Sequence, residues 1–404
     1  MPDAAQEAVA LLRTTAATRA RAQALLASAR AGESAHFAID DAAMDAAVQA
    51  VVDVTRARYP RLVFPYHSRW RHFEAGGIDR RAQLDALLGD ASAPDKARAQ
   101  IDLALVSVLL DAGAGPDWRY GEAGQTFSRS EGLGVASFHA FCAGLFSSDP
   151  AHPLRADAAG LRALTTERLA HAFQVSAANP LVGLEGRAAL LRRLGEVLGG
   201  NTAYFGSDGR PGGLFDRLAT SGEVQVHAIL SALLDGLAPI WPAQNAIQGI
   251  ALGDCWRHSA VRGPGLTDGW MPFHKLSQWL TYSLLEPFEW AGIKVHGLDA
   301  LTGLPEYRNG GLFLDAGVIV PRDAQLAART LQAGDEPIVE WRALTVALLD
   351  ELAPLVRARL GQTADAMPLA CILEGGTWAA GRALAQRLRG GTPPLNIVSD
   401  GTVF

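Results

Sequence analysis

Cysteine, net positive charge and long apolar runs are all scarce in this sequence of 404 residues. The three cysteines, Cys142, Cys255 and Cys371, are far apart and odd in number, which argues against a framework of disulfide bonds. The net charge of −6 disfavours a nucleic-acid-binding protein, because such proteins carry a basic face. No apolar run approaches the roughly 20 residues that span a bilayer, and residues 1–23 do not resemble a signal peptide. We therefore expect a cytoplasmic protein that binds neither nucleic acid nor a membrane.

Motifs for cofactors and metals are also missing. No GxGxxG, P-loop, GxSxG or HExxH pattern occurs in a suitable context. The glycine-rich segment 209–216 lacks both a preceding strand and the P-loop lysine. Cys255 and His258 have a spacing that a metal could use, but no second Cys/His cluster accompanies them. The sequence thus predicts neither a cofactor nor a metal.

Helix-forming residues dominate what is present. Ala, Leu, Arg and Gly are abundant and strand formers are sparse, which favours a mainly α fold with at most small β elements. Apolar stripes at helical spacing predict helices within 44–52, 101–109, 165–173, 190–198, 276–285 and 338–355. Long loops rich in glycine, arginine and aromatic residues separate them at 65–77, 113–134, 201–213 and 248–270. The best boundary between two lobes of one compact unit is near residue 155, giving 1–155 and 156–404.

The segment from Leu301 to Val320 has the strongest chemical signal. Glu306, Tyr307 and Arg308 follow a Gly/Pro turn and precede an apolar run. A carboxylate beside such a run is partly desolvated, which suits it to catalysis, and Arg308 could hold it ionised or bind a phosphate. The alternative is a structural Glu–Arg pair at a helix start, and these residues alone leave both interpretations open.

The loop 65–77 is a candidate clamp for an anion or a planar substrate. His67, Arg69 and Trp70 lie in the motif HSRWRHFEAGG. Guanidinium groups and indole planes suit phosphate and planar amide ligands. A solvated basic loop is the alternative.

Two further segments combine charge with an expected helix start. Arg129 and Glu131 lie in RSEG, before a helix expected from Val135, and form either an ordinary helix entry or a ligand site. Lys275 opens a leucine-rich helix, where its charge opposes the helix dipole. It is either a partner for a carboxylate or phosphate, or a surface lysine.

Four segments resemble, in order, the queuosine salvage N-glycosidase family: 164–198, 272–289, 301–319 and 371–384. A closer resemblance covers essentially the whole chain and is to the uracil-catabolism protein 4 family, domain-of-unknown-function family 1688. Its hallmarks appear as SRWRHFEAGG (68–77), GPDWRYGE (115–122), RSEGLGVASFHAF (129–141), FSSDP (146–150), LGDCW (252–256) and PEYRNGG (305–311).

The resemblance implies a two-lobed helical fold similar to helical DNA-glycosylase-like domains. It places Glu306 on the catalytic aspartate of the queuosine proteins and Lys275 on their lysine. Glu374 and Trp378 fall on a C-terminal acidic position and the tryptophan that follows it. The sequence departs from the queuosine pattern in having Glu for that Asp, His274 for a Tyr, and Ala379 for a second acidic residue.

The resemblance also implies a role in uracil breakdown. We expect an N-glycosidase that hydrolyses the ribosyl bond of a ribosylurea-type nucleoside or its 5′-phosphate, with Glu306 and Lys275 as catalytic residues. The expected substrate-binding residues are His67, Arg69, Trp70, Arg129, Glu131, Asp254, Trp256, His274, Tyr307, Arg308, Glu374 and Trp378. An amidohydrolase acting on the ureido group and a non-catalytic nucleotide-binding protein are the alternatives. The sequence does not indicate an oligomeric state.

Overall fold

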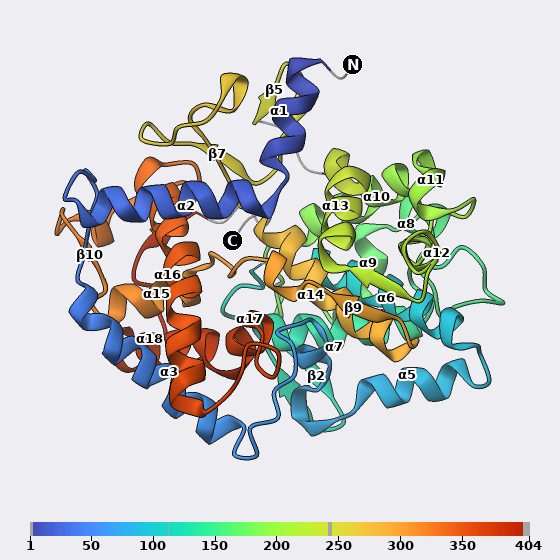
Figure 1. Ribbon diagram of the computed structural model, residues 1–404. Coiled ribbons are helices and arrows are strands. Elements are labelled where there is room, and N and C mark those ends of the chain that lie inside the picture. The colour runs from blue at the N-terminus through green and yellow to red at the C-terminus, as the bar shows by residue number, and fades with distance from the viewer. Residues whose placement is uncertain (1–2, 112, 241–244, 399–404) are drawn as a thin grey trace. The chain divides into compact units, whose positions relative to one another are not determined.

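The computed structural model describes residues 3–111, 113–240 and 245–398 (Figure 1). It is mainly α, as the composition predicts, and the strands in this part of the chain form six two-stranded pairs. The chain divides into two compact units. Unit 1 comprises Met1–His67, Ala243–Trp279 and Leu298–Phe404, and unit 2 comprises Ser68–Pro242 and Leu280–Gly297. Unit 1 combines segments from both ends of the chain, and the expected lobe boundary near residue 155 stays a prediction.

Unit 1 contains helices from both ends of the sequence. Its helices are α1 (Ala4–Leu12), α2 (Thr15–Arg30), α3 (Met44–Arg58), α15 (Tyr307–Asp315), α16 (Glu336–Leu360), α17 (Leu369–Ile372) and α18 (Trp378–Arg389), with the first turn of α14 (Lys275–Trp290). Its strand pairs are β1 (Phe37–Ile39) with β10 (Ile319–Pro321), β5 (Ala246–Ile247) with β6 (Ile250–Ala251), β7 (Cys255–Arg257) with β8 (Trp270–Pro272), and β11 (Thr330–Leu331) with β12 (Asn396–Ile397). The first three pairs are antiparallel and the last is parallel.

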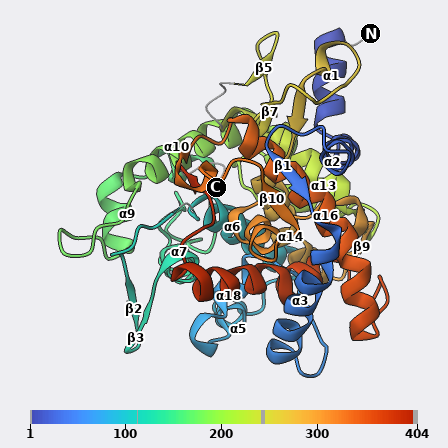
Figure 2. The ribbon, with the colours of Figure 1, turned by 90° about the vertical axis from the view of Figure 1, so that its left-hand side faces the viewer.

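Helix α16 forms the centre of unit 1. Its apolar residues are buried on nearly every side, and α2 and α3 pack against it. Figure 1 shows α2 lying across α16, and Figure 2 shows α18 with one end beside α3. The helix ends at Gly361, whose left-handed φ of 66° is a conformation that glycine adopts without strain.

Two glycines bring the elements of the candidate site close together. A Cβ atom on Gly376 would lie 2.7 Å from the Val51 carbonyl oxygen, so that the segment before α18 lies directly on α3. A Cβ atom on Gly381 would overlap the carbonyl oxygen of Arg308, so that α18 lies on the first turn of α15. Glycine at both positions therefore allows the close packing that sets the positions of Glu374 and Arg308.

Unit 2 is built around the buried helix α6. Its helices are α4 (Trp70–Phe73), α5 (Arg80–Leu88), α6 (Ala93–Leu109), α7 (Arg129–Cys142), α8 (Ala158–Arg162), α9 (Thr166–Ala172), α10 (Leu184–Gly200), α11 (Thr202–Phe205), α12 (Gly213–Leu218), α13 (Val226–Leu237) and the remainder of α14. Its strand pairs are antiparallel β2 (Tyr120–Glu122) with β3 (Gln125–Phe127), and parallel β4 (Glu223–Gln225) with β9 (Lys294–His296).

Helix α7 begins at Arg129 and not at Val135 as the sequence suggested. Gly132 and Gly134 therefore lie inside the helix. Glycine is needed at both positions, because a Cβ atom would lie 2.9 Å from the Trp118 ring at Gly132 and 2.8 Å from the His72 side chain at Gly134. The other predicted helices are present within α3, α6, α9, α10, α14 and α16. Within the described residues, no helix is both long and apolar enough to span a bilayer.

Candidate active site

Glu374 is the best-defined group of the candidate site in unit 1. It lies in a π-helical turn, Leu373–Thr377, between α17 and α18 and is buried. One carboxylate oxygen accepts hydrogen bonds from Arg58 at 2.6 Å and from the Tyr59 hydroxyl at 3.1 Å. The other lies 2.8 Å from Nδ1 of His67. Short π-helical turns within α-helices occur frequently at functional sites.

The environment keeps Glu374 ionised. Burial raises the pKa of the carboxyl group, but the hydrogen bonds from His67 and Arg58 and the charge of Arg58 outweigh burial, so that its pKa is lowered. An ionised Glu374 accepts the Nδ1 proton of His67, which leaves the imidazole lone pair at Nε2. The pair therefore has the arrangement of a carboxylate that orients a histidine general base.

Trp378 links this pair to the Leu301–Val320 segment. Its ring centroid lies 6.2 Å from that of His67. The guanidinium of Arg308 lies over the Trp378 ring. Its central carbon is 4.2 Å from the centroid of the Trp378 ring and 4.7 Å from that of the Tyr307 ring. Arg308 thus meets Glu306 through its backbone N–H, while its guanidinium stacks on two aromatic rings.

Glu306 forms the N-cap of helix α15. Its backbone is extended, and its side-chain oxygens accept the Asn309 N–H at 2.6 Å and the Arg308 N–H at 2.9 Å. The residue is 8% exposed. Glu306 thus lies at a helix start, where its side chain caps backbone N–H groups. Each of its carboxylate oxygens can accept a further hydrogen bond, and its role in catalysis stays a prediction.

Asp254 connects the other predicted residues of unit 1. Its carboxylate accepts two hydrogen bonds from Arg342, at 2.7 and 2.8 Å, one from Trp256 Nε1 at 2.7 Å and one from the Lys275 backbone N–H at 2.9 Å. Burial raises the pKa of Asp254, but the charge of Arg342 and these hydrogen bonds outweigh it and lower the pKa to about 2. Asp254 therefore fixes the start of α14, at the lysine that the sequence singles out.

Arg342 and Gln278 join this group to the loop before Glu306. Arg342 also donates to the Pro305 carbonyl oxygen at 3.2 Å. The Gln278 side chain, on the first turn of α14, exchanges hydrogen bonds with the backbone and hydroxyl of Thr302 at 2.8 and 2.7 Å. Lys275 and Glu306 are thus attached to one hydrogen-bonded framework.

His274 has a structural partner. It is buried, has a positive φ of 50°, and its Nε2 lies 3.0 Å from the Leu12 carbonyl oxygen, to which it donates. Burial lowers its pKa, so that the neutral ring is favoured. A direct contact between His274 and a substrate stays a prediction.

Four predicted residues lie in unit 2. Arg69 is fully buried, pairs with Asp111 at 2.9 Å and donates to the Ser107 hydroxyl at 2.6 Å. Burial lowers its pKa, opposed by the charge of Asp111. Trp70 donates to the Ser283 carbonyl oxygen at 3.0 Å. Their expected role as a substrate clamp stays a prediction.

Arg129 and Glu131 begin helix α7 in unit 2. Arg129 is exposed and has a left-handed φ of 54°, a conformation uncommon for residues other than glycine. Glu131 is half-buried and its charge acts on Arg69.

Sequence reasoning missed three partners in unit 1, Arg58, Tyr59 and Arg342. Each lies in or next to a predicted helix whose pattern gives no sign of a distant carboxylate. In unit 2 it also missed Glu286, which lines a cavity of about 460 Å³ with Trp70, Arg71 and Trp290. Burial raises the pKa of Glu286, opposed by the charge of Arg71.

The fold and this site define a mainly α protein with a buried, ionised carboxylate–imidazole pair. Residues 11–404 match the family described as protein of unknown function (DUF1688), and the chain belongs to this family. Protein urg3 of Schizosaccharomyces pombe is 40% identical over 410 residues, covering 98% of this chain and 99% of that protein. Uracil catabolism protein 4 of Lachancea kluyveri is 39% identical over 411 residues, covering 92% and 93%. The resemblance to the uracil-catabolism protein 4 family, seen in the sequence motifs, is confirmed.

Proposed function

We propose that this protein acts in uracil catabolism as an N-glycosidase, which hydrolyses the ribosyl bond of a ribosylurea-type nucleoside or its 5′-phosphate to urea and ribose or ribose phosphate. The name of the relative from Lachancea kluyveri supports the pathway. The observation that carries the reaction type is the buried Glu374–His67 pair, which Trp378 and Arg308 connect to Glu306.

Hydrolysis of an N-ribosyl bond passes through a state with positive charge on the sugar ring, which a carboxylate stabilises. Glu306 is the carboxylate that we assign to this task, because its two N–H partners occupy only part of its acceptor capacity. His67, held by Glu374, accepts the proton of the attacking water at Nε2. The bond from the anomeric carbon to the urea nitrogen breaks as water attacks, and the leaving nitrogen takes up a proton equal to the one that His67 accepts from the water, which leaves His67 neutral again.

Cationic side chains near this group suit a phosphorylated substrate. Arg308 is half-buried and lies on the faces of two aromatic rings, an arrangement that holds a guanidinium in place for an anion. Lys275, half-buried at the start of α14, is the second cation that we assign to the phosphate or to the orientation of Glu306.

The direct test is release of urea from ribosylurea and from its 5′-phosphate by the purified protein. Urea together with ribose or ribose phosphate is the expected product pair. Ammonia and carbon dioxide in place of urea would identify an amidohydrolase. Binding of both compounds without turnover would identify a binding protein, and either outcome overturns the glycosidase proposal.

Two substitutions separate the capping role of Glu306 from catalysis. Asp is a good N-cap, so E306D should keep the stability of the protein, while its carboxylate is withdrawn by one methylene and activity falls. E306Q keeps the length, loses the charge, and should lose about 10²–10³-fold in kcat. T165A, which removes the cap of α9, is the matched control and should lose about 1 kcal/mol of stability with activity unchanged. Wild-type kcat in both E306 variants would remove Glu306 from the mechanism.

A further inference from the structure

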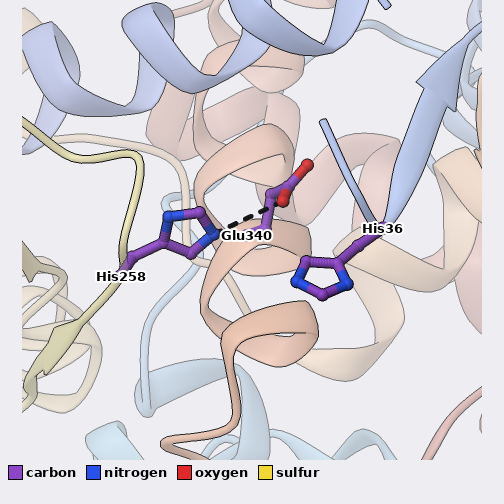
Figure 3. Close-up of side chains that lie close together, drawn as sticks. All are labelled: His36, His258 and Glu340. Atoms are coloured by element: carbon purple, nitrogen blue, oxygen red, sulfur yellow. Dashed lines mark ion pairs between the residues drawn. The ribbon is translucent and has the colours of Figure 1, made fainter. Parts of the chain in front are cut away.

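Three side chains of unit 1, distant in sequence, bring potential metal-binding atoms together. His36 precedes β1, His258 follows β7 and Glu340 is on α16. One nitrogen or oxygen atom from each lies within 4.8 Å of the others. Figure 3 shows the two imidazole rings on either side of the Glu340 side chain. The proposed glycosidase reaction uses none of these three residues.

The His258–Glu340 distance already suits a metal. Nε2 of His258 lies 3.3 Å from the nearer Glu340 carboxylate oxygen. Two ligands of a tetrahedral zinc ion, each bound at about 2.0 Å, are about 3.3 Å apart. Both side chains are only 3% exposed, and His258 Nε2 is a buried atom whose contact with Glu340 lacks the geometry of a hydrogen bond. A buried polar atom in this state calls for a ligand.

Ser34 orients two of the three residues. Its hydroxyl donates to the other Glu340 oxygen and accepts the backbone N–H groups of His36 and Phe37, both at 3.0 Å. One donor and two acceptor sites of a hydroxyl are thereby in use. Partners of this kind fix the ligands of metal sites. Here the arrangement leaves the second Glu340 oxygen facing His258.

Glu336 supplies a second negative charge. It lies one helical turn before Glu340, with an oxygen 3.8 Å from His36 Nε2. It also accepts hydrogen bonds from the Ser259 N–H at 2.6 Å and the Ser259 hydroxyl at 3.1 Å. The charges of two carboxylates, Glu336 and Glu340, balance that of a divalent cation.

From this geometry we propose that His36, His258 and Glu340 bind one divalent transition-metal ion of the zinc class. The nitrogen and oxygen donor set favours Zn²⁺, Co²⁺ or Ni²⁺ over Mg²⁺ and Ca²⁺, which prefer oxygen ligands. The ion takes the place of the proton between His258 Nε2 and Glu340. The His36 side chain is 27% exposed and moves inward to complete three protein ligands, with water in the fourth position.

Binding requires one local rearrangement. The exposed Ala260 donates its N–H to Nδ1 of His258 at 3.1 Å, which places the ring proton on Nε2. A metal at Nε2 moves that proton to Nδ1, and the Ala260 N–H must turn towards water. Because Ala260 is exposed in a turn, water can satisfy its N–H after this change. The ion then links the segment before β1, the segment after β7, and α16.

The test is titration of chelator-treated protein with Zn²⁺ and Co²⁺, followed by calorimetry and by the visible absorption of bound cobalt. We expect one ion per chain, cobalt bands of four-coordinate type, and a higher melting temperature with Zn²⁺. H36A and E340Q should each weaken binding by about 100-fold or more, and S34A, which loses only the orienting hydroxyl, by about 10–100-fold.

His152 provides the matched control. It is exposed and pairs with the single carboxylate of Asp149 at 2.7 Å, so that H152A tests adventitious binding to a His–carboxylate pair and should bind metal as the wild type does. H36A is the variant expected to fold normally, because His36 is partly exposed. Absence of saturable Zn²⁺ or Co²⁺ binding by the wild type would overturn the proposal, as would wild-type affinity in both H36A and E340Q.

Discussion

Replacing Asp254 with asparagine probes the framework that supports the candidate site. Asp254 accepts four hydrogen bonds, two of them from Arg342, which is 1% exposed and also donates to the Pro305 carbonyl beside Glu306. The D254N variant keeps the shape of the side chain. It removes the negative charge and places an amide NH₂ against groups that are all hydrogen-bond donors.

The size of the effect follows from the pKa. Folding lowers the pKa of Asp254 from 3.8 to about 2, and at about 1.4 kcal/mol for each pKa unit the ionised form contributes about 2 kcal/mol. Because D254N also removes the carboxylate that faces the buried Arg342 cation, we expect a total loss of about 3–5 kcal/mol at neutral pH. A lowered pKa means that this contribution is present above pH 3.8 and is lost as the pH falls towards 2. The gap between wild type and D254N should therefore narrow only below about pH 4.

Urea unfolding of wild type and D254N at a series of pH values measures this gap. Asp41 of the same unit provides the control, because it also accepts hydrogen bonds from two nitrogen atoms of an arginine, Arg30, but its side chain is 58% exposed. D41N should cost less than about 1 kcal/mol. If D254N cost no more than D41N, the argument from burial would be refuted. Urea release by D254N should also fall, because Pro305 and Lys275 lose their support.

Three further substitutions test other parts of the structure. E374Q should lower the unfolding free energy by about 2–4 kcal/mol at neutral pH. Because the pKa of Glu374 is lowered, the difference from wild type in urea unfolding should shrink below pH 4.5. The control D315N removes another buried, arginine-paired carboxylate and should leave urea release unchanged, whereas E374Q should abolish it. G376A should lower the unfolding free energy by about 1–3 kcal/mol, because its Cβ meets the backbone of α3; a melting curve equal to the wild type would contradict this packing. The pKa of Glu286 is raised, so its neutral form stabilises unit 2 at low pH and this contribution is lost as the pH rises. In urea unfolding, the stability of E286Q relative to wild type should therefore increase with pH. A decrease would show that the pKa of Glu286 is lowered instead.

The helices could be predicted from the sequence because their signals are local. Thr165 caps α9 as expected, accepting the Arg168 N–H, and Asp40 caps the turn that leads into α3. The two units could not be predicted, because they depend on distant pairings. Strand β1 pairs with β10, with Phe37 opposite Pro321, and neither short strand has a pattern that specifies the other.

The candidate site could be predicted in part. The family motifs identified Glu306, Arg308, Glu374 and Trp378, which the structure brings into one connected group. The motifs did not identify the cationic side chains that keep the carboxylates ionised. Arg58 is 316 residues from Glu374 in the sequence, and the charge of a buried carboxylate depends on such partners and not on its neighbours in the chain.

Three carboxylates that looked equivalent in the sequence have different capacities in the structure. A carboxylate has about four acceptor sites. Asp254 uses four and Glu374 uses three, whereas Glu306 uses two, both for backbone N–H groups of its own helix. Asp254 therefore suits support, and Glu374 suits the orientation of His67. Glu306 has the most capacity left for charge that develops on a sugar, which is why it remains our choice for the catalytic carboxylate although it caps a helix.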